Sequence, residues 1–115
     1  MPPVLDSVDN RDAGYLAAMQ RRANRLAALT PVSEAILRDP PPGDWLAYRR
    51  TDDAHGFSPL ATIDRTNAHR LTLAWAQALD AGTNGITPLV HDGVIFVNSN
   101  GTVSAIDAVS GDQLW

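Results

Sequence analysis

The chain has 115 residues, of which 44% are hydrophobic, 19% charged and 6% aromatic. This length predicts one domain, and the composition excludes a globally disordered or fibrous protein. Nine basic residues against 13 acidic ones give a formal net charge of −4, so the sequence offers no electrostatic basis for nucleic acid or an anionic membrane as a partner. The absence of Cys excludes disulfides, thiolate zinc sites and a Cys nucleophile.

The N-terminal segment carries no recognisable targeting signal. Residues 1–14 are acidic and contain Pro, without the basic and apolar regions of a secretory signal peptide. No run of 18 apolar residues is present, so no membrane span is predicted in this sequence. Two interpretations stay open: a cytoplasmic protein, or a chain whose true start is missing or miscalled.

Residues 10–29 are predicted to form an amphipathic helix, with Ser7, Asp9 or Asn10 as its N-cap and an end before Pro31. One face carries the apolar residues Tyr15, Met19, Leu26 and Leu29. The opposite side carries Arg11, Arg21, Asn24 and Arg25. We interpret these arginines as a solvated face, the alternative being a site for an anionic partner.

A short helical turn is predicted at 33–38, with Ser33 as its cap. The Pro-rich run at 39–44 then stops any helix. We therefore place a domain boundary here, with a helical N-terminal extension at 1–39 and a β-rich part at 40–115. Residues 1–37 are one candidate interaction arm.

The β-rich part has strand patterns at 71–79, 86–90, 94–97 and 102–106, and a fourth meander strand begins at 112–115. Turn sequences separate the last four segments. The continuous apolar run 94–97 predicts a strand buried on both faces, so this sheet requires neighbours stacked on each side. That requirement is typical of a propeller blade.

The last eleven residues follow the pattern Ala-x-Asp-x-x-x-Gly-x-x-x-Trp, with Ala105, Asp107, Gly111 and Trp115 at the defining positions. Ala105 permits close sheet stacking, Asp107 can accept bonds from turn amides, Gly111 can adopt a positive φ, and Trp115 offers a flat face to an adjacent blade. This pattern resembles the tryptophan-docking motif of the quinoprotein dehydrogenases.

The resemblance extends upstream through four further segments, at 40–51, 57–60, 63–75 and 87–94. Together they are similar to the entry segment and first blade of alcohol dehydrogenases that depend on pyrroloquinoline quinone (PQQ). The implied fold is mainly β, the start of an eight-bladed β-propeller. In it 71–79 is the closing outer strand and 86–115 the first blade, and the N-terminal α-helical extension precedes both. Trp115 at the end of a strand pattern suggests a chain cut off in mid-fold.

The resemblance implies an enzyme that oxidises an alcohol to a carbonyl with PQQ held on calcium or a lanthanide, passing electrons to a cytochrome c or a quinone in the periplasm. The base and metal ligands of the family lie in later blades, so no catalytic or metal residue is assigned here. The fragment is expected to be inactive, to bind no cofactor alone and to have a poorly formed β half.

One family position does fall in this chain, and Gly85 replaces the Glu that contacts PQQ in many members. Asn84 beside it is the candidate cofactor-binding residue, although a plain loop residue is the other interpretation. The missing carboxylate favours the alternative function, a non-catalytic PQQ-repeat scaffold for protein–protein interaction. The entry segment 45–60 favours the enzyme.

The three histidines are given structural or solvent-exposed roles. His55 follows Asp52 and Asp53, but this spacing fits no standard metal-ligand set, so a solvated loop is expected. His69 is expected to cap or pack before a strand, and His91 to face solvent in a hairpin turn. The sequence shows no Ser-His-Asp order, phosphate loop or zinc pattern.

Overall fold

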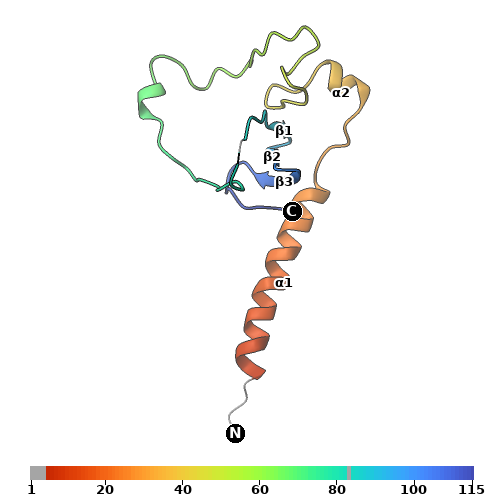
Figure 1. Ribbon diagram of the computed structural model, residues 1–115, viewed down its shortest axis with the longest axis vertical. Helices are drawn as coiled ribbons and strands as arrows, with labels where there is room; N and C mark the ends of the chain where they lie inside the picture. Colours follow the sequence, from red (N-terminus) through yellow and green to blue (C-terminus); the bar gives the residue numbers. More distant parts are fainter. Residues whose placement is uncertain (1–4, 83) are drawn as a thin grey trace.

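The computed structural model describes residues 5–82 and 84–115, with side chains described from residue 12 onward. The elements in chain order are α1 (Leu5–Ala27), α2 (Glu34–Arg38), the 3-10 turn η1 (Ala68–Arg70), β1 (Leu89–His91), β2 (Val94–Ser99) and β3 (Thr102–Asp107) (Figure 1). The helices therefore precede the sheet in the chain, as the sequence predicted.

The three strands form an antiparallel sheet in the order β1-β2-β3. Each hairpin turns on two residues with positive φ, which are Asp92 and Gly93 at 46° and 72°, and Asn100 and Gly101 at 49° and 82°. Two successive positive φ values define the type I′ turn, whose twist matches that of paired strands. The predicted meander is confirmed over these residues, although β1 begins only after Pro88, which has no amide proton for a ladder.

The chain after β3 turns back and pairs with it. Gln113 forms a bridge with Ile106, and the Asp107 amide donates to the Asp112 carbonyl at 2.9 Å. The segment 112–115 thus lies where a fourth strand was predicted, along the outer edge of β3.

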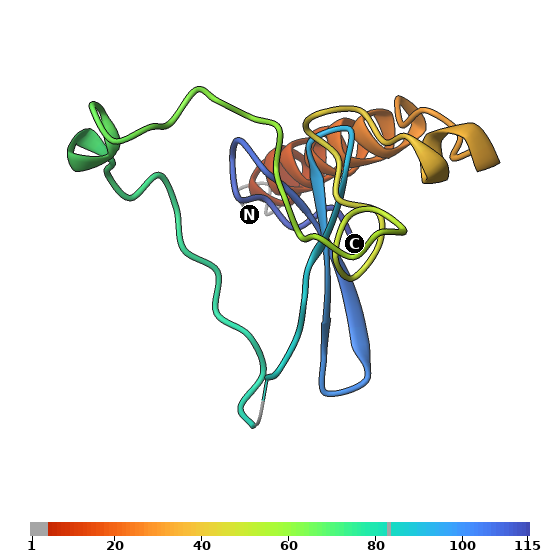
Figure 2. The same cartoon turned by 90° about the horizontal axis from the view of Figure 1, so that it is seen from above.

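The predicted strand at 71–79 is wrong for this structure. Residues 56–74 run in a wide arc away from the sheet, interrupted only by η1 (Figures 1 and 2). Leu71 and Leu73 keep the alternation that suggested a strand, but they are 63% and 83% exposed. A strand requires a hydrogen-bonded partner, and none of the described strands forms backbone pairs with this segment.

The sheet is a thin layer with different covers on its two faces. On one face Val94, Ala105 and Leu114 form the buried cluster, against which Leu26 and Leu29 pack from the helical end of the chain. On the other face Val97 and Ile106 are buried, and residues 77–80 line a hollow beside them. The expected burial on both faces holds for Val94 and Val97, whereas Ile95 and Phe96 are half-buried.

Helix α1 contacts the sheet only through its C-terminal end and otherwise projects from it as a rod (Figure 1). The helix begins at Leu5, so Ser7, Asp9 and Asn10 lie inside it and the predicted capping role is wrong. Acidic residues in a first turn complement the helix dipole, which allows the helix to extend through them. No helix in the described part of the chain has the length and apolarity needed to cross a bilayer. At α2, Ser33 Oγ accepts from the Ile36 amide at 3.3 Å, which confirms that cap.

The Pro-rich run is folded around a buried arginine that the sequence did not single out. Arg50 is 9% exposed and has φ 70°. Its guanidinium donates to the carbonyls of Asp44, Pro40 and Pro41 at 3.2, 3.0 and 3.3 Å. Because Pro-rich backbone cannot satisfy its own carbonyls, Arg50 fixes the path of the chain into the sheet.

Replacing Arg50 with Met should open this entry segment while retaining much of the side-chain volume. We expect a loss of about 2 kcal/mol in local stability, since bonds from a charged donor are lost and buried carbonyls are left unpaired. Hydrogen exchange at the Trp45 amide, which donates to the Val90 carbonyl at 2.8 Å, measures this opening.

Arg49→Met is the matched control, since Arg49 is exposed, donates to the Ala54 carbonyl at 3.5 Å and lies over the exposed Tyr48 ring, away from the Pro-rich carbonyls. It should change the Trp45 exchange rate little. Equal effects of the two substitutions would contradict a structural role for Arg50.

Candidate functional site

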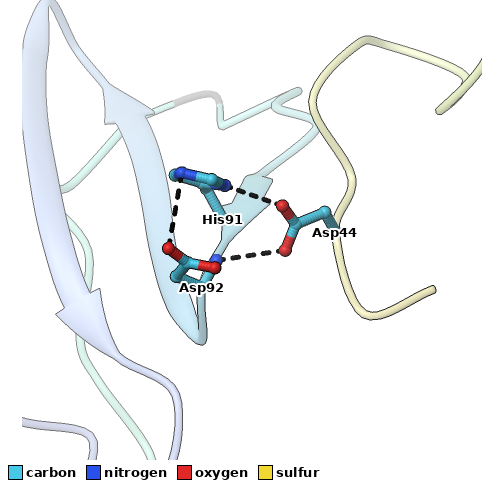
Figure 3. A group of neighbouring side chains, drawn as sticks. All are labelled: Asp44, His91 and Asp92. Carbon is cyan, nitrogen blue, oxygen red and sulfur yellow. Dashed lines mark hydrogen bonds and ion pairs between the residues drawn. The ribbon is translucent and has the colours of Figure 1, made fainter. Parts of the chain in front are cut away.

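Three charged or titratable side chains meet where the entry segment crosses the first hairpin (Figure 3). His91 Nδ1 lies 2.7 Å from Asp44 Oδ2, and the other oxygen of Asp44 accepts from the Asp92 amide at 3.0 Å. His91 Nε2 lies 2.7 Å from the Thr30 carbonyl, and the Thr30 amide donates to Asp92 Oδ2 at 2.6 Å. We call these four residues, Thr30, Asp44, His91 and Asp92, the His91 clasp.

The expectation that His91 faces solvent is wrong, because its side chain is only 8% exposed. Both ring nitrogens face oxygen acceptors, a carbonyl and a carboxylate, so these contacts favour the protonated ring, which donates from both nitrogens. The bond to the Thr30 carbonyl and the contacts with Asp44 raise the pKa of His91, and burial opposes this rise. The hairpin lies where it was predicted, but Asp92 and Gly93 alone form its turn, which leaves His91 inside β1 and buried.

The clasp brings three potential metal ligands, Asp44, His91 and Asp92, within 4.8 Å of one another, and hydrogen bonds already engage each of them. A metal requires a free imidazole lone pair, and both nitrogens of His91 are engaged as hydrogen-bond donors. Both oxygens of Asp44 also accept bonds, from His91 and from the Asp92 amide. The arrangement is therefore a structural clasp that ties the helical end, the entry segment and the hairpin together.

The motif residues Asp107 and Gly111 shape the turn that follows β3. Asp107 Oδ1 accepts from the amides of Val109 and Ser110, each at 3.0 Å, and these bonds lower the pKa of Asp107. Gly111 has φ 77° and lies against the ring of Trp75, where an added Cβ would be 2.7 Å from ring atoms. The Trp75 indole also donates to the Ala108 carbonyl at 3.0 Å. Trp75 thus contacts the turn at both Ala108 and Gly111.

Arg25 connects helix α1 to the same turn. Its Nε donates to Asp107 Oδ2 at 2.9 Å, with the side chains 31% and 16% exposed. Arg25 also donates to the Asp92 carbonyl in the first hairpin. For this arginine both sequence interpretations are wrong, because it is neither solvated nor free for an outside anion. Arg21 and Arg22 stay exposed.

The other two motif residues occupy the sheet face that α1 covers only in part. Ala105 is completely buried in the core cluster. Trp115 is 50% exposed, and its ring lies 6.3 Å from that of Phe96 in a tilted arrangement. Half of a large aromatic surface is therefore available beside the sheet.

Asn84, the candidate cofactor residue, is engaged inside the chain. Its Oδ1 accepts from Ser99 Oγ at 2.6 Å, and its Nδ2 donates to the Asp80 carbonyl at 3.0 Å. Both polar atoms of the Asn84 side chain are therefore engaged within the chain, and Gly85 offers no side chain. The role of Asn84 in cofactor binding stays a prediction.

The remaining histidines are exposed. His55 lies in a loop with Nδ1 3.2 Å from Asp53, as the solvated-loop interpretation predicted. His69 lies within η1 and is exposed, so the expectation that it caps or packs is wrong. Asn67 and Asp64 make the local bonds there instead, with the Asp64 amide donating to Asn67 Oδ1 at 2.8 Å.

The His91 clasp should lose stability as the pH rises. A raised histidine pKa means that the contribution is complete below the unfolded value of 6.5 and disappears as the pH passes the folded value. The pKa of Asp92 is lowered, chiefly by the bonds from Thr30, so its contribution is lost only when the pH falls below 3.8. Exchange protection of the Asp92 amide, corrected for intrinsic rates, should be greatest between these limits.

His91→Gln should abolish the loss of Asp92 amide protection above the pKa of His91, because Gln cannot carry the charge. Protection that stays constant from about pH 6 to about pH 9 in the unaltered chain would show that the imidazolium is not what holds the clasp.

Comparison with known proteins agrees with the resemblance to quinoprotein dehydrogenases that the sequence motifs indicated. The model of the glucose/ethanol/alcohol dehydrogenase β-propeller domain, PQQ, matches residues 45–115. Quinohemoprotein alcohol dehydrogenase ADH IIB of Pseudomonas putida is 46% identical over 99 residues, which are 81% of this chain and 14% of the relative. The dehydrogenase subunit of alcohol dehydrogenase (quinone) of Komagataeibacter europaeus is 44% identical over 86 residues, 71% of this chain and 12% of the relative.

A third relative is 1-butanol dehydrogenase (cytochrome c) of Thauera butanivorans, 38% identical over 76 residues, 64% of this chain and 11% of the relative. The chain thus spans about a seventh or less of the length of these relatives. The family match covers more than half of the chain and includes the hairpins, the turn at Asp107 and the Trp75 contact. The chain therefore belongs to the PQQ β-propeller family of glucose, ethanol and alcohol dehydrogenases.

Proposed function

We propose that this chain forms the entry segment and first blade of an eight-bladed propeller in a PQQ-dependent dehydrogenase that oxidises an alcohol to a carbonyl. The observation that carries the proposal is the contact of Trp75 with Gly111 inside the segment that matches the family. Trp75, from the segment 71–79, contacts Gly111 in the turn that follows β3. Such a contact is what joins two successive blades.

The geometry of the motif supports its assignment as a tryptophan-docking motif. The indole N–H of Trp75 donates to the Ala108 carbonyl, and this hydrogen bond fixes the orientation of the ring as well as its position. Trp115 is the next tryptophan along the chain and leaves half of its surface exposed next to Phe96. By analogy with Trp75, Trp115 contacts the turn glycine of the next blade.

The cofactor of the whole protein is PQQ on calcium or a lanthanide ion, which supplies the two-electron oxidant. The chain alone is expected to bind neither, because Asn84 is engaged by Ser99 and Asp80, and both ring nitrogens of His91 are held by hydrogen bonds. The names of two relatives, a quinohemoprotein and a cytochrome c-linked enzyme, support a cytochrome c or a quinone as electron acceptor. The proposed location is the periplasm.

A specific observation favours a second function. Gly85 stands where many members have a glutamate, and the side chain of Asn84 is bonded to Ser99 of β2 and to Asp80. A propeller without PQQ contacts would serve as a scaffold for other proteins. The entry segment that Arg50 organises is the feature that supports the enzyme over the scaffold.

Gly111→Ala tests the docking contact directly. The added methyl would meet the Trp75 ring at 2.7 Å and would also have to adopt a positive φ, so Trp75 should be displaced. We expect hydrogen exchange of the Trp75 indole to accelerate by roughly tenfold or more, equivalent to at least about 1.4 kcal/mol. The indole signal is assigned with Trp75→Phe.

Gly101→Ala is the matched control. Its φ of 82° imposes the same backbone cost of about 1 kcal/mol, but nothing lies within 4 Å of the added Cβ. It should leave the Trp75 indole unchanged. If both substitutions accelerate exchange equally, the effect comes from backbone strain and the docking assignment fails.

The activity is tested by expressing this chain alone and the complete reading frame that contains it. With PQQ and Ca²⁺, the complete protein should reduce an artificial dye when a primary alcohol is added, and this chain should not. A complete protein that folds and binds no PQQ would support the scaffold instead. Activity in the 115-residue chain alone would contradict the requirement for later blades.

A further inference from the structure

Helix α1 carries a regular seam of side chains that the sheet does not cover. Asp12, Tyr15, Met19 and Arg22 follow one another at spacings of three, four and three residues, which is the spacing of a coiled-coil seam. Tyr15 is 62% and Met19 47% exposed, and Leu16 beside them is 63% exposed. This apolar surface lies on the part of α1 that projects from the sheet (Figure 1).

The seam continues an interface that already exists in the molecule. Four residues beyond Arg22, Leu26 packs against the buried cluster at Leu114. Tyr15, Met19, Ala23, Leu26 and Leu114 line one continuous hollow along the helix. The same stripe is therefore buried at one end of α1 and open at the other, which is the arrangement expected where a second helix completes the packing.

The charges at the two ends of the exposed seam indicate the orientation in which a second copy of α1 would pack on it. In an antiparallel pair related by a two-fold axis near residue 17, Tyr15 lies opposite Met19 of the second copy, and Asp12 lies opposite Arg22. In a parallel pair, Asp12 would face Asp12 and Arg22 would face Arg22, and like charges in such positions repel. The seam is thus self-complementary in the antiparallel direction alone.

We propose that α1 is a self-association element through which two copies of this protein pair as an antiparallel helix dimer. The occupant of the exposed seam is α1 of the second copy. The seam has two apolar layers flanked by two ion pairs, so the dimer is weak and its formation depends on concentration and on salt. The inference is independent of the dehydrogenase function, since no residue of the seam belongs to the motif or to the clasp.

A charge-swap series on the full 115-residue chain tests the proposal by analytical ultracentrifugation at neutral pH. Asp12→Arg places Arg opposite Arg22 of the other copy, and Arg22→Asp places Asp opposite Asp12. Each single variant should raise the dimer dissociation constant roughly tenfold, because two attractive pairs become repulsive. The double variant, Asp12→Arg with Arg22→Asp, restores opposite charges and should return the constant to within about threefold of the starting value.

Arg21→Asp is the matched control, since it makes the same charge change as Arg22→Asp at an exposed position outside the seam. It should leave the dissociation constant within about threefold of the parent value. Helical circular dichroism of every variant, recorded at the same concentration, identifies a substitution that merely unfolds α1.

Cross-linking gives a second readout, because the chain contains no natural cysteine. A mixture of Tyr15→Cys and Met19→Cys chains should form mixed disulfides faster than either variant forms disulfides with itself. A chain that is monomeric at all concentrations would overturn the proposal. So would a dimer that the double variant fails to restore, or one in which each cysteine variant links best to its own kind, as a parallel pair or association through the sheet would give.

Discussion

The buried contact between Asp44 and His91 is the constraint on which the rest of this structure depends. It joins residues 47 positions apart, and the other ring nitrogen reaches the Thr30 carbonyl 61 positions away. Since each ring nitrogen is bonded to a different segment, the one side chain of His91 holds the helical end, the entry segment and the first hairpin at once. Breaking such a buried pair from one side leaves an uncompensated charge, which is more costly than the pair is favourable.

The connections of the sheet fall at its two ends. At the end formed by Asp92 and Asp107, the clasp and Arg25 attach the helical extension. At the opposite end, Asn84 binds Ser99 and the Asn100 side chain donates to the Ala81 carbonyl at 2.6 Å. The sheet edge and the exposed half of Trp115 lie between these ends. The bonds that hold the chain together therefore leave the broad faces for the apolar contacts that a stacked blade requires.

Local chemistry was predictable from the sequence, and pairing between distant segments was not. The turns at Asp92-Gly93 and Asn100-Gly101 follow from residues that tolerate positive φ, and Ser33 caps α2 through a neighbour three positions away. By contrast, the strand predicted at 71–79 needed a partner strand, and the burial of His91 depends on Asp44 and Thr30. The buried role of Arg50 was equally invisible, because its partners are main-chain carbonyls of Pro40, Pro41 and Asp44, which carry no side-chain signal.

Asp107 has one role that its motif predicts, in the turn after β3, and a second contact, with Arg25, that the motif does not predict. Its Oδ1 accepts the amides of Val109 and Ser110, a role confined to four consecutive residues and therefore visible in the sequence. Its Oδ2 takes no part in that turn and instead binds Arg25, 82 positions earlier. A carboxylate has two oxygens, so the turn can be kept while the second oxygen binds whatever cation the chain brings to it. In this protein Arg25 of α1 binds that second oxygen, so the helix is attached to the turn while both turn bonds are kept.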